Sequence, residues 1–187
     1  MKTYRIGRLA AGILLSFLLM LLTVGCAQSA AGDPFAKVSG NFDAEITWSF
    51  PAAESETAKG ETRVQYAAGV RVRDGLLTLS FTSPESMAGI EVRELAGGGA
   101  EIRRNGTVLT GTAYARYLKA ARLLTQTGPI SERTTEPDGI TLTYLVTLSD
   151  GSTRTRTMSL DGKGIPISVT EPEYTTVRVV WFEAAEE

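Results

Sequence analysis

Cys26 is the sole cysteine of this 187-residue chain, and the chain contains no histidine. The commonest general base in enzymes and the commonest zinc ligand are therefore missing. Neither a nucleophile elbow, nor a Ser-x-x-Lys motif, nor a metal-ligand spacing occurs in the sequence. Asp43 and Glu45 share one face of an expected strand, but alternating carboxylates are typical of any exposed face. We therefore expect no enzymatic activity, no metal site and no cofactor.

The first 25 residues predict where Cys26 and the rest of the chain are located. Lys2, Arg5 and Arg8 form a basic start, and residues 9–24 form an apolar run that ends at small residues. This run is about 16 residues long, which is short of the roughly 20 that a spanning helix needs. The pattern predicts a cleaved secretory signal, with an uncleaved anchor as an alternative.

The stretch Leu22-Thr23-Val24-Gly25-Cys26 resembles the lipobox of bacterial lipoproteins. In that motif the signal is cut before a cysteine that carries a diacylglyceryl thioether and acyl chains such as palmitate. One position departs from the motif, because Thr23 stands where leucine is usual. The resemblance implies a signal peptide over residues 1–25, a lipidated Cys26 with a short tether to residue 34, and one domain over residues 35–187. It also implies attachment to the extracytoplasmic face of the cell membrane, and an ordinary secretory signal remains the rival interpretation.

The charge of the chain limits its partners. Without the three cations of residues 1–25, the formal charge of −2 becomes −5. A net acidic protein is a poor match for nucleic acid, and it does not adhere to anionic lipid through charge alone. Membrane attachment would then rest on the diacylglyceryl anchor, since two acyl chains suffice for stable anchoring.

Alternation of apolar and polar residues dominates the sequence from residue 42 onward. Residues 42–50, 76–83, 140–148 and 175–182 show it most clearly, with turn signals between such runs. About nine to ten short strands joined by tight turns predict one large antiparallel sheet. The expected class is mainly β (α+β), with a curved, unclosed sheet.

Residues 112–125 form the one stretch with a convincing helical period, and we expect this main helix to pack on the concave side of the sheet. Thr112 is the expected N-cap, and Gly128-Pro129 ends the helix. The apolar positions are Tyr114, Tyr117, Leu118, Ala121 and Leu124. On the opposite side, Arg116, Lys119 and Arg122 lie three residues apart. These cations form either a solvated face or a stripe that meets lipid headgroups at the mouth of a pocket.

Two registers follow from the turns and the alternation. A two-residue turn at Asp150-Gly151 pairs Ser149 with Ser152. This register places Arg154, Arg156 and Met158 on the face opposite to Leu142, Tyr144 and Val146. In the last strand, Trp181 is expected to share a face with Val177 and Val179.

Three stretches together resemble the LolA-like lipoprotein-carrier superfamily, which includes LolB and the mycobacterial lipoprotein LppX. They are residues 42–48, residues 79–84 with 89–92, and the turn at 160–166 with the strand that ends in Val180-Trp181-Phe182. The resemblance implies an unclosed antiparallel half-barrel whose concave apolar face is covered by helices and holds acyl chains. The helix that usually precedes the first strand is expected to be absent or very short, because Pro34 and Gly40 interrupt that region.

Two functions are compatible with these patterns. In the first, the concave face binds or carries a lipid, a lipopeptide or another hydrophobic ligand. Its candidate ligand-binding residues, for each of which ordinary core packing is the alternative, are Phe42, Ile46, Trp48, Tyr144, Val146 and Trp181. In the second, the protein is a non-catalytic envelope interaction module that binds a protein partner through loops or an edge strand. A dry, filled core would favour the second function.

Overall fold

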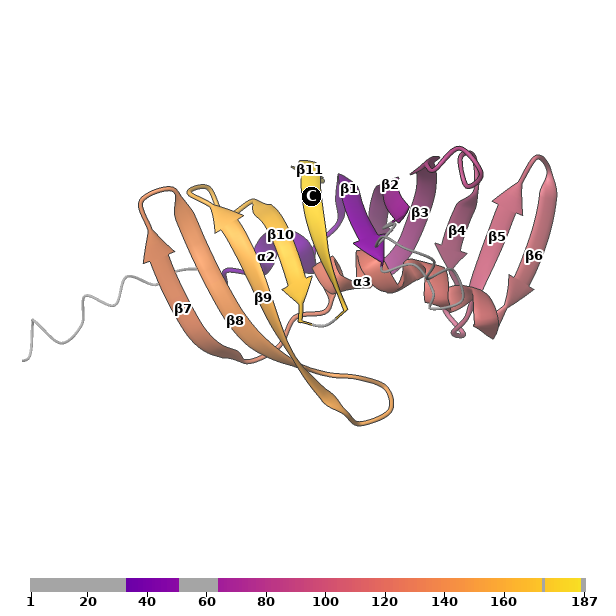
Figure 1. Ribbon diagram of the computed structural model, residues 1–187. Coiled ribbons are helices and arrows are strands. Elements are labelled where there is room, and N and C mark those ends of the chain that lie inside the picture. The colour runs from indigo at the N-terminus through magenta and orange to yellow at the C-terminus, as the bar shows by residue number, and fades with distance from the viewer. Residues whose placement is uncertain (1–32, 51–63, 173, 186–187) are drawn as a thin grey trace, which may run out of the picture. The chain divides into compact units, whose positions relative to one another are not determined.

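The computed structural model describes residues 33–50, 64–172 and 174–185 (Figure 1). The chain divides into two units, Met1–Pro34 and Phe35–Glu187, and the description below concerns the second unit. The expected signal peptide, Cys26 and most of the tether lie outside the described residues. None of the helices in the described ranges has the length and hydrophobicity needed to cross a membrane.

Eleven strands of the described ranges form one antiparallel sheet in the order β6-β5-β4-β3-β2-β1-β11-β10-β9-β8-β7 (Figure 1). Most strands that pair in the sheet are also consecutive in the sequence. The exception is the pairing of β1 with β11 at the centre of the sheet. The edge strands β6 and β7 do not pair with each other, which confirms the predicted curved and unclosed half-barrel. The strands are β1 Phe42–Phe50, β2 Val64–Arg73, β3 Leu76–Ser83, β4 Glu91–Glu94, β5 Ala100–Arg104, β6 Thr107–Gly111, β7 Ile130–Glu136, β8 Gly139–Thr147, β9 Thr153–Asp161, β10 Pro166–Glu171 and β11 Thr175–Ala184.

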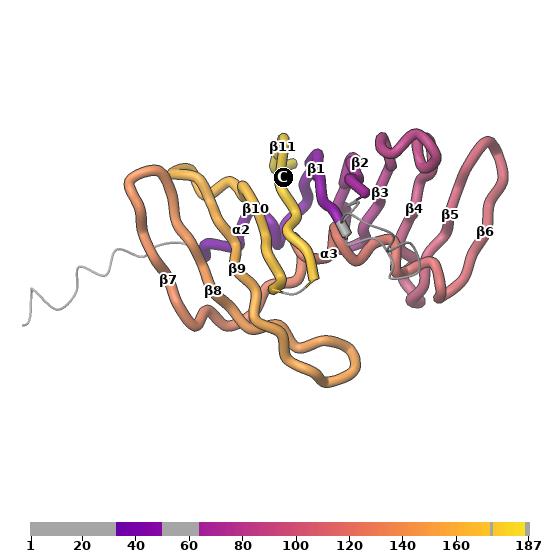
Figure 2. Tube along the Cα trace, in the orientation of Figure 1, coloured from indigo at the N-terminus to yellow at the C-terminus, as the bar shows by residue number. Residues whose placement is uncertain are grey.

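The predicted main helix consists of a 3₁₀ segment, η2 (Thr112–Leu118), followed by the α-helix α3 (Lys119–Thr125). Figure 2 shows this segment running from the β6 edge toward the centre of the sheet. The expected N-cap is wrong, because Gly111 precedes the first helical residue and no side chain caps it. A further helix before β1, α2 (Ala36–Ser39), has four residues and is as short as expected.

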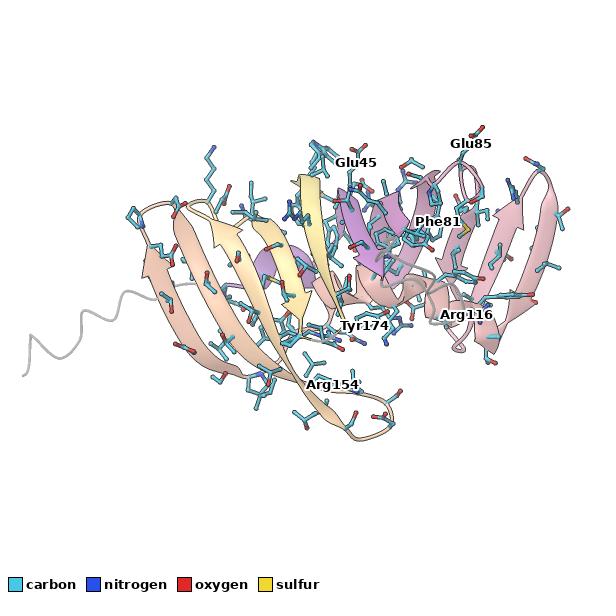
Figure 3. The ribbon with its side chains drawn as sticks, in the orientation of Figure 1. Glu45, Phe81, Glu85, Arg116, Arg154 and Tyr174 are labelled. Atoms are coloured by element: carbon cyan, nitrogen blue, oxygen red, sulfur yellow. The ribbon has the colours of Figure 1, made fainter. Side chains whose placement is uncertain are left out.

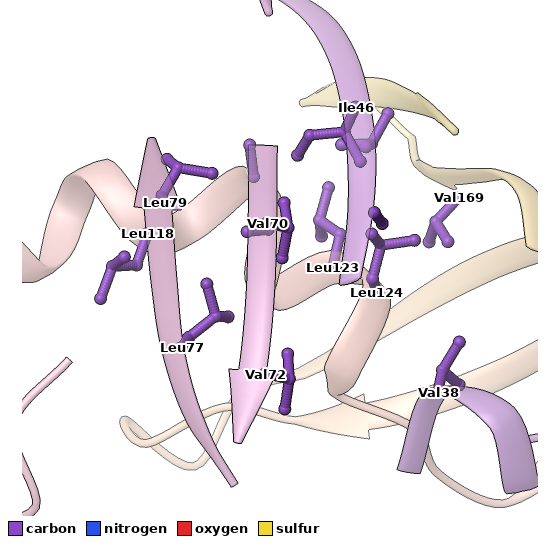
Figure 4. Packing of buried hydrophobic residues seen from close by; sticks show 14 of the residues in the cluster. Val38, Ile46, Val70, Val72, Leu77, Leu79, Leu118, Leu123, Leu124 and Val169 are labelled. Atoms are coloured by element: carbon purple, nitrogen blue, oxygen red, sulfur yellow. The ribbon is translucent and has the colours of Figure 1, made fainter. Parts of the chain in front are cut away.

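The core lies between the helical segment and the inner face of the sheet, the face that carries Phe42 and Ile46. Leu118, Leu123 and Leu124 are fully buried among the inward-facing side chains of the strands (Figure 4). Burying each such leucine contributes about 1.5–3 kcal/mol. The helical segment therefore occupies part of the inner face instead of leaving it open.

The hairpin between β8 and β9 departs from the predicted register. Leu148 N donates to Ser152 O at 2.8 Å, so the loop has three residues and Gly151 occupies it at φ +80°. Asp150 Oδ1 accepts a hydrogen bond from Ser152 N at 2.9 Å and fixes this turn. Three-residue loops with glycine in the left-handed region are a common hairpin type. The one-residue difference makes the predicted register wrong.

The shifted register moves Arg154, Arg156 and Met158 to the other face of the sheet. Tyr144 pairs with Arg156, and Leu142 pairs with Met158. Because side chains alternate along a strand, a slip of one residue exchanges the two faces. Arg156 and Met158 are consequently buried on the inner face.

A second irregularity lies in β11, where Ile46 pairs with Val179 but Glu45 pairs with Trp181. Val180 is therefore an extra residue, a β-bulge that reverses the alternation beyond it. Trp181 lies on the outer face and is 47% exposed. The expectation that Trp181 shares a face with Val177 and Val179 is wrong. Phe182 takes the inward position instead and stacks on Phe42 with the ring centroids 4.9 Å apart.

Candidate ligand-binding pocket

Three adjacent strands bring an aromatic cluster together near one end of the inner face. Trp48 of β1 lies directly opposite Tyr66 of β2, and their rings stack at 5.4 Å with an interplanar angle of 14°. Phe81 of β3 lies 5.9 Å from the Trp48 ring and meets Tyr66 edge-on at 6.4 Å. Cross-strand aromatic pairs of this kind are worth roughly 0.5–1.5 kcal/mol beyond their buried area. The cluster forms a continuous aromatic wall.

This wall borders a cavity of about 460 Å³, which we call the aromatic pocket. Figure 3 labels Phe81, Arg116 and Tyr174 of its lining, which come from β3, from η2 and from the residue before β11. The volume lies within the roughly 300–1,000 Å³ that is usual for ligand sites. The full lining is Trp48, Tyr66, Phe81, Met87, Arg116, Tyr117, Lys119, Ala120 and Tyr174.

Two of the three cations predicted to form a stripe line this pocket. Lys119 Nζ lies 3.8 Å from the centroid of the Tyr174 ring. Arg116 Cζ lies 5.0 Å from the centroid of the Tyr117 ring, and Arg116 Nη2 donates to Tyr117 Oη at 3.2 Å. The third cation, Arg122, is paired with Glu94. The three cations therefore do not form one uniform, fully solvated face: Arg116 and Lys119 line the pocket, and Arg122 is in an ion pair.

Burial, and secondarily the nearby Glu171 carboxylate, raise the pKa of Tyr174 to about 12. The phenol therefore stays neutral across the physiological pH range. A neutral ring presents its π face to the Lys119 ammonium, a contact worth about 0.5–1 kcal/mol at an exposed site. Tyr174 thereby holds Lys119 at the pocket.

Trp48 contributes an unusual polar atom to the pocket. Its side chain is 4% exposed, and its Nε1 has no hydrogen-bond acceptor among the described residues. A buried donor without a partner costs about 1–3 kcal/mol. Trp48 and Tyr174 also line a second, more polar cavity of about 710 Å³ at the ends of β1, β10 and β11.

A second polar cluster, which the predicted register had excluded, lies under the C-terminal end of α3. Arg156 Nε donates to Glu171 Oε2 at 2.9 Å, and both side chains are buried. Arg156 Nη1 donates to Gln126 Oε1 at 3.2 Å. Tyr144 lies beside Arg156, and its pKa is raised to about 12, chiefly by burial. Phe35 covers the Tyr144 ring edge-on at 5.1 Å, so this region is filled.

Of the six candidate residues from the sequence, Trp48 lines the aromatic pocket. Phe42, Ile46, Tyr144 and Val146 are buried in the core and are not part of the lining of either cavity described here. Trp181 lies on the opposite face of the sheet. Contact of any of the six with a ligand stays a prediction.

Five large lining residues were not ligand-binding candidates in the sequence analysis, and two of them could have been found. Tyr66 and Phe81 occupy inward positions of β2 and β3, the two strands that follow β1 in the sequence and in the sheet, so they could have been found from strand pairing. Met87 and Tyr174 lie in turns, where the alternation of apolar and polar residues does not predict which way a side chain points. Tyr117 was recognised as an apolar helix position, but the partner it faces depends on the fold.

No family model and no curated protein matches this chain. Among solved structures, it is similar to an uncharacterized conserved protein from Thermus thermophilus, with 10% identity over 83% of this chain and 85% of that chain and a TM-score of 0.46. It is also similar to PNGF-II, with 9% identity over 79% of this chain and 28% of that chain and a TM-score of 0.38.

A further similar structure is MucB, with 12% identity over 86% of this chain and 60% of that chain and a TM-score of 0.35. MucB has also been solved in complex with MucA(peri). All of these TM-scores lie below 0.5, so the function proposed below rests on the residues of this chain alone.

Proposed function

We propose that this protein is a membrane-anchored extracytoplasmic lipoprotein that binds a lipid or another hydrophobic ligand in the aromatic pocket. The observation that carries the proposal is the aromatic wall of Trp48, Tyr66 and Phe81 bordering a cavity of about 460 Å³. Apolar, aromatic cavities with a few polar groups are the usual form of ligand sites. The anchor at Cys26 follows from the lipobox resemblance, and we propose no catalytic role.

The filled core narrows the proposed ligand site from the whole concave face to this pocket. Leu118, Leu123 and Leu124 occupy the centre of the inner face, where a carrier of several acyl chains would need open space. Opening that space would expose apolar surface at about 25 cal/mol per Å². A small hydrophobic ligand beside Trp48 needs no such opening.

Photolabelling tests the proposal. The full chain, in nanodiscs of zwitterionic lipid, is irradiated with a long-chain alcohol that carries a diazirine at its tail, and the adducts are mapped by mass spectrometry. We expect adducts on the pocket lining, chiefly on Tyr66, Phe81 and Met87. Met87 is partly exposed in a turn and packs against the edge of the core, so Met87→Trp should fill the pocket and suppress labelling.

Met87→Leu is the matched control, because it keeps an apolar side chain of similar volume and should preserve labelling. Adducts spread evenly over the outer face, or labelling that is the same in both variants, would contradict the proposal.

A second function is favoured by the edge strand β6. Its residues Thr107–Gly111 include no charge, and Val108 and Leu109 are 49% and 52% exposed. The opposite edge, β7, carries Glu132, Arg133 and Glu136. Charges on an edge strand discourage pairing with another chain, whereas an uncharged edge permits it. The alternative proposal is that β6 binds an extended segment of an envelope protein.

Site-specific crosslinking in the native membrane separates this alternative from ligand binding. A photoactivatable amino acid replaces Leu109 on β6, and the matched control replaces Thr134 on β7. A discrete crosslinked species from position 109 alone would support partner binding. Equal or absent crosslinking at the two edges would oppose it.

A further inference from the structure

We infer that the aromatic pocket takes a single-chain amphiphile with an anionic headgroup, which Lys119 and Arg116 hold at the mouth. This inference rests on the proposed function, because it requires that the pocket bind a hydrophobic chain. It adds the sign of the headgroup charge and the residues that select it.

The first reason to expect an anionic headgroup is the charge of the side chains that line the pocket. Among the described residues that line the pocket, two are cations and none is a carboxylate. The Glu94 carboxylate is paired with Arg122, and neither Lys119 nor Arg116 has a carboxylate partner in the described part of the chain. The whole chain is net acidic. The positive potential is therefore a local property of this mouth, where a partly desolvated anion is attracted more strongly than in bulk water.

The backbone places the two cations together. In a 3₁₀ helix residues i and i+3 eclipse one another, and η2 keeps this spacing up to Leu118. Arg116 and the first residue of α3, Lys119, consequently project to the same side. Each of them also rests on an aromatic ring of the lining, Tyr117 or Tyr174. The rings hold the two charged groups at the pocket. One guanidinium nitrogen of Arg116, Nη2, donates to Tyr117 Oη, and the remaining N–H groups of Arg116 and the Lys119 ammonium can donate to an anion.

The pocket itself defines the rest of the ligand. The wall below the cations is aromatic or thioether, from Trp48, Phe81 and Met87, and suits a hydrocarbon chain. A volume of about 460 Å³ lies in the lower half of the usual range of roughly 300–1,000 Å³, which suits one chain. Together these groups match a fatty-acid-like or alkyl-phosphate-like molecule.

Trp48 emission provides a direct readout. Because the chain has two tryptophans and Trp181 is exposed on the outer face, Trp181→Phe leaves Trp48 as the single reporter. The full chain with this substitution, in nanodiscs of zwitterionic lipid, is titrated with dodecanoate, dodecyl phosphate, dodecyl maltoside and dodecyltrimethylammonium. Free probe is measured by equilibrium dialysis, so that partition into the nanodisc is subtracted.

We expect the two anionic probes to bind about tenfold or more tightly than the maltoside, since a hydrogen bond to a charged group is worth about 1.5–3 kcal/mol. Lys119→Gln and Arg116→Gln should each weaken the anionic probes about tenfold and leave the maltoside unchanged. Both side chains are exposed, so neither substitution threatens the fold. Arg133→Gln on β7 makes the same change in net charge far along the sheet and should have no effect.

The outcomes separate the two proposals. If the maltoside binds as tightly as the anions, or if the cationic probe binds best, the headgroup inference is overturned while ligand binding stands. If no probe changes Trp48 emission, ligand binding in the pocket fails and the headgroup inference fails with it. A preference for dodecanoate over dodecyl phosphate, or the reverse, supports the inference and distinguishes a fatty acid from a phospholipid-like ligand.

Discussion

Arg156 places a positive charge inside the core, where its guanidinium meets the carboxylate of Glu171. Removing each ion from water costs several kcal/mol, and mutual attraction offsets this only when the geometry is good. Gln126 satisfies a further N–H of the guanidinium. Removing one partner of this pair should therefore lower the free energy of unfolding much more than replacing both residues with apolar side chains.

Glu171→Leu should lower the free energy of unfolding by about 3–5 kcal/mol, because it leaves the Arg156 charge buried and unpaired. The double variant Arg156→Met/Glu171→Leu should recover most of that loss, since apolar side chains then fill the same space. Urea unfolding followed by tryptophan fluorescence measures both values. A double variant as unstable as the single one would show that packing, and not the unpaired charge, causes the loss.

Asp161 connects stability to pH through the turn between β9 and β10. Its Oδ1 accepts hydrogen bonds from the backbone N–H groups of Ile165 and Lys163, each at 2.8 Å, and these bonds hold the pKa of the carboxyl below its usual range. The unfolded chain therefore binds the proton more readily than the folded chain. The resulting stability is present above the unfolded pKa of about 4 and is lost as the pH falls through the lower folded value.

Asp161→Asn keeps an acceptor oxygen but cannot titrate, so its free energy of unfolding should fall less steeply between about pH 5 and pH 3. Urea titrations at a series of pH values measure the two slopes. Identical slopes for the variant and the natural chain would show that this carboxyl does not contribute to acid sensitivity.

The link from α3 to β7 leaves no room for a side chain at Gly128. A Cβ atom added there would lie 1.8 Å from the carbonyl oxygen of Leu145 in β8. Leu145 N also donates to Pro129 O at 3.1 Å, so the link cannot move away without breaking a hydrogen bond. Glycine is required here because the two backbones approach too closely for any side chain.

Gly128→Ala should therefore lower the free energy of unfolding by about 2 kcal/mol or more, as overpacked sites typically do. Gly162→Ala is the matched control, because a Cβ at that position meets nothing within 4 Å. Thermal and urea unfolding of the two variants measure the difference. Equal stability of the two variants would contradict the close approach.

The alternation of apolar residues predicted most strands correctly but misassigned two faces. Alternation fixes which residues of one strand point the same way, and it cannot count an extra residue between strands or within one. The loop between β8 and β9 has three residues where two were predicted, and β11 contains one extra residue, Val180. Each extra residue shifts the alternation of the two faces by one position. These two shifts moved Arg156 inward and Trp181 outward, which no pattern within a single strand reveals.

The pocket was only partly predictable for a similar reason. Trp48 was a candidate because its strand alternates clearly, and the cations of residues 116 and 119 were considered for a pocket mouth. Tyr174 and Met87 lie in turns whose positions depend on the packing of β10, β11 and the helical segment. Such contacts join residues far apart in the sequence, and spacing alone cannot bring them together.

At the scale of the whole protein, the proposed anchor determines where the pocket works. Cys26→Ser should release the processed chain from membranes into the soluble fraction, because the mature protein would retain neither a diacylglyceryl group nor a net positive charge. Fractionation and immunoblotting of cells that express each form measure the distribution. Membrane attachment of a correctly processed Cys26→Ser protein would overturn the lipobox interpretation.

The pairing of β1 with β11 also governs the order in which the sheet can be completed. Phe42 and Ala184 face each other across the middle of the sheet although they lie near opposite ends of the unit. Strands β1–β6 and β7–β10 can pair locally with their sequence neighbours, but the central seam between β1 and β11 forms only after β11 has been synthesised. A nascent chain therefore holds two unjoined half-sheets until β11 has been synthesised, and loss of Thr175–Ala184 would leave it without the strand that joins them.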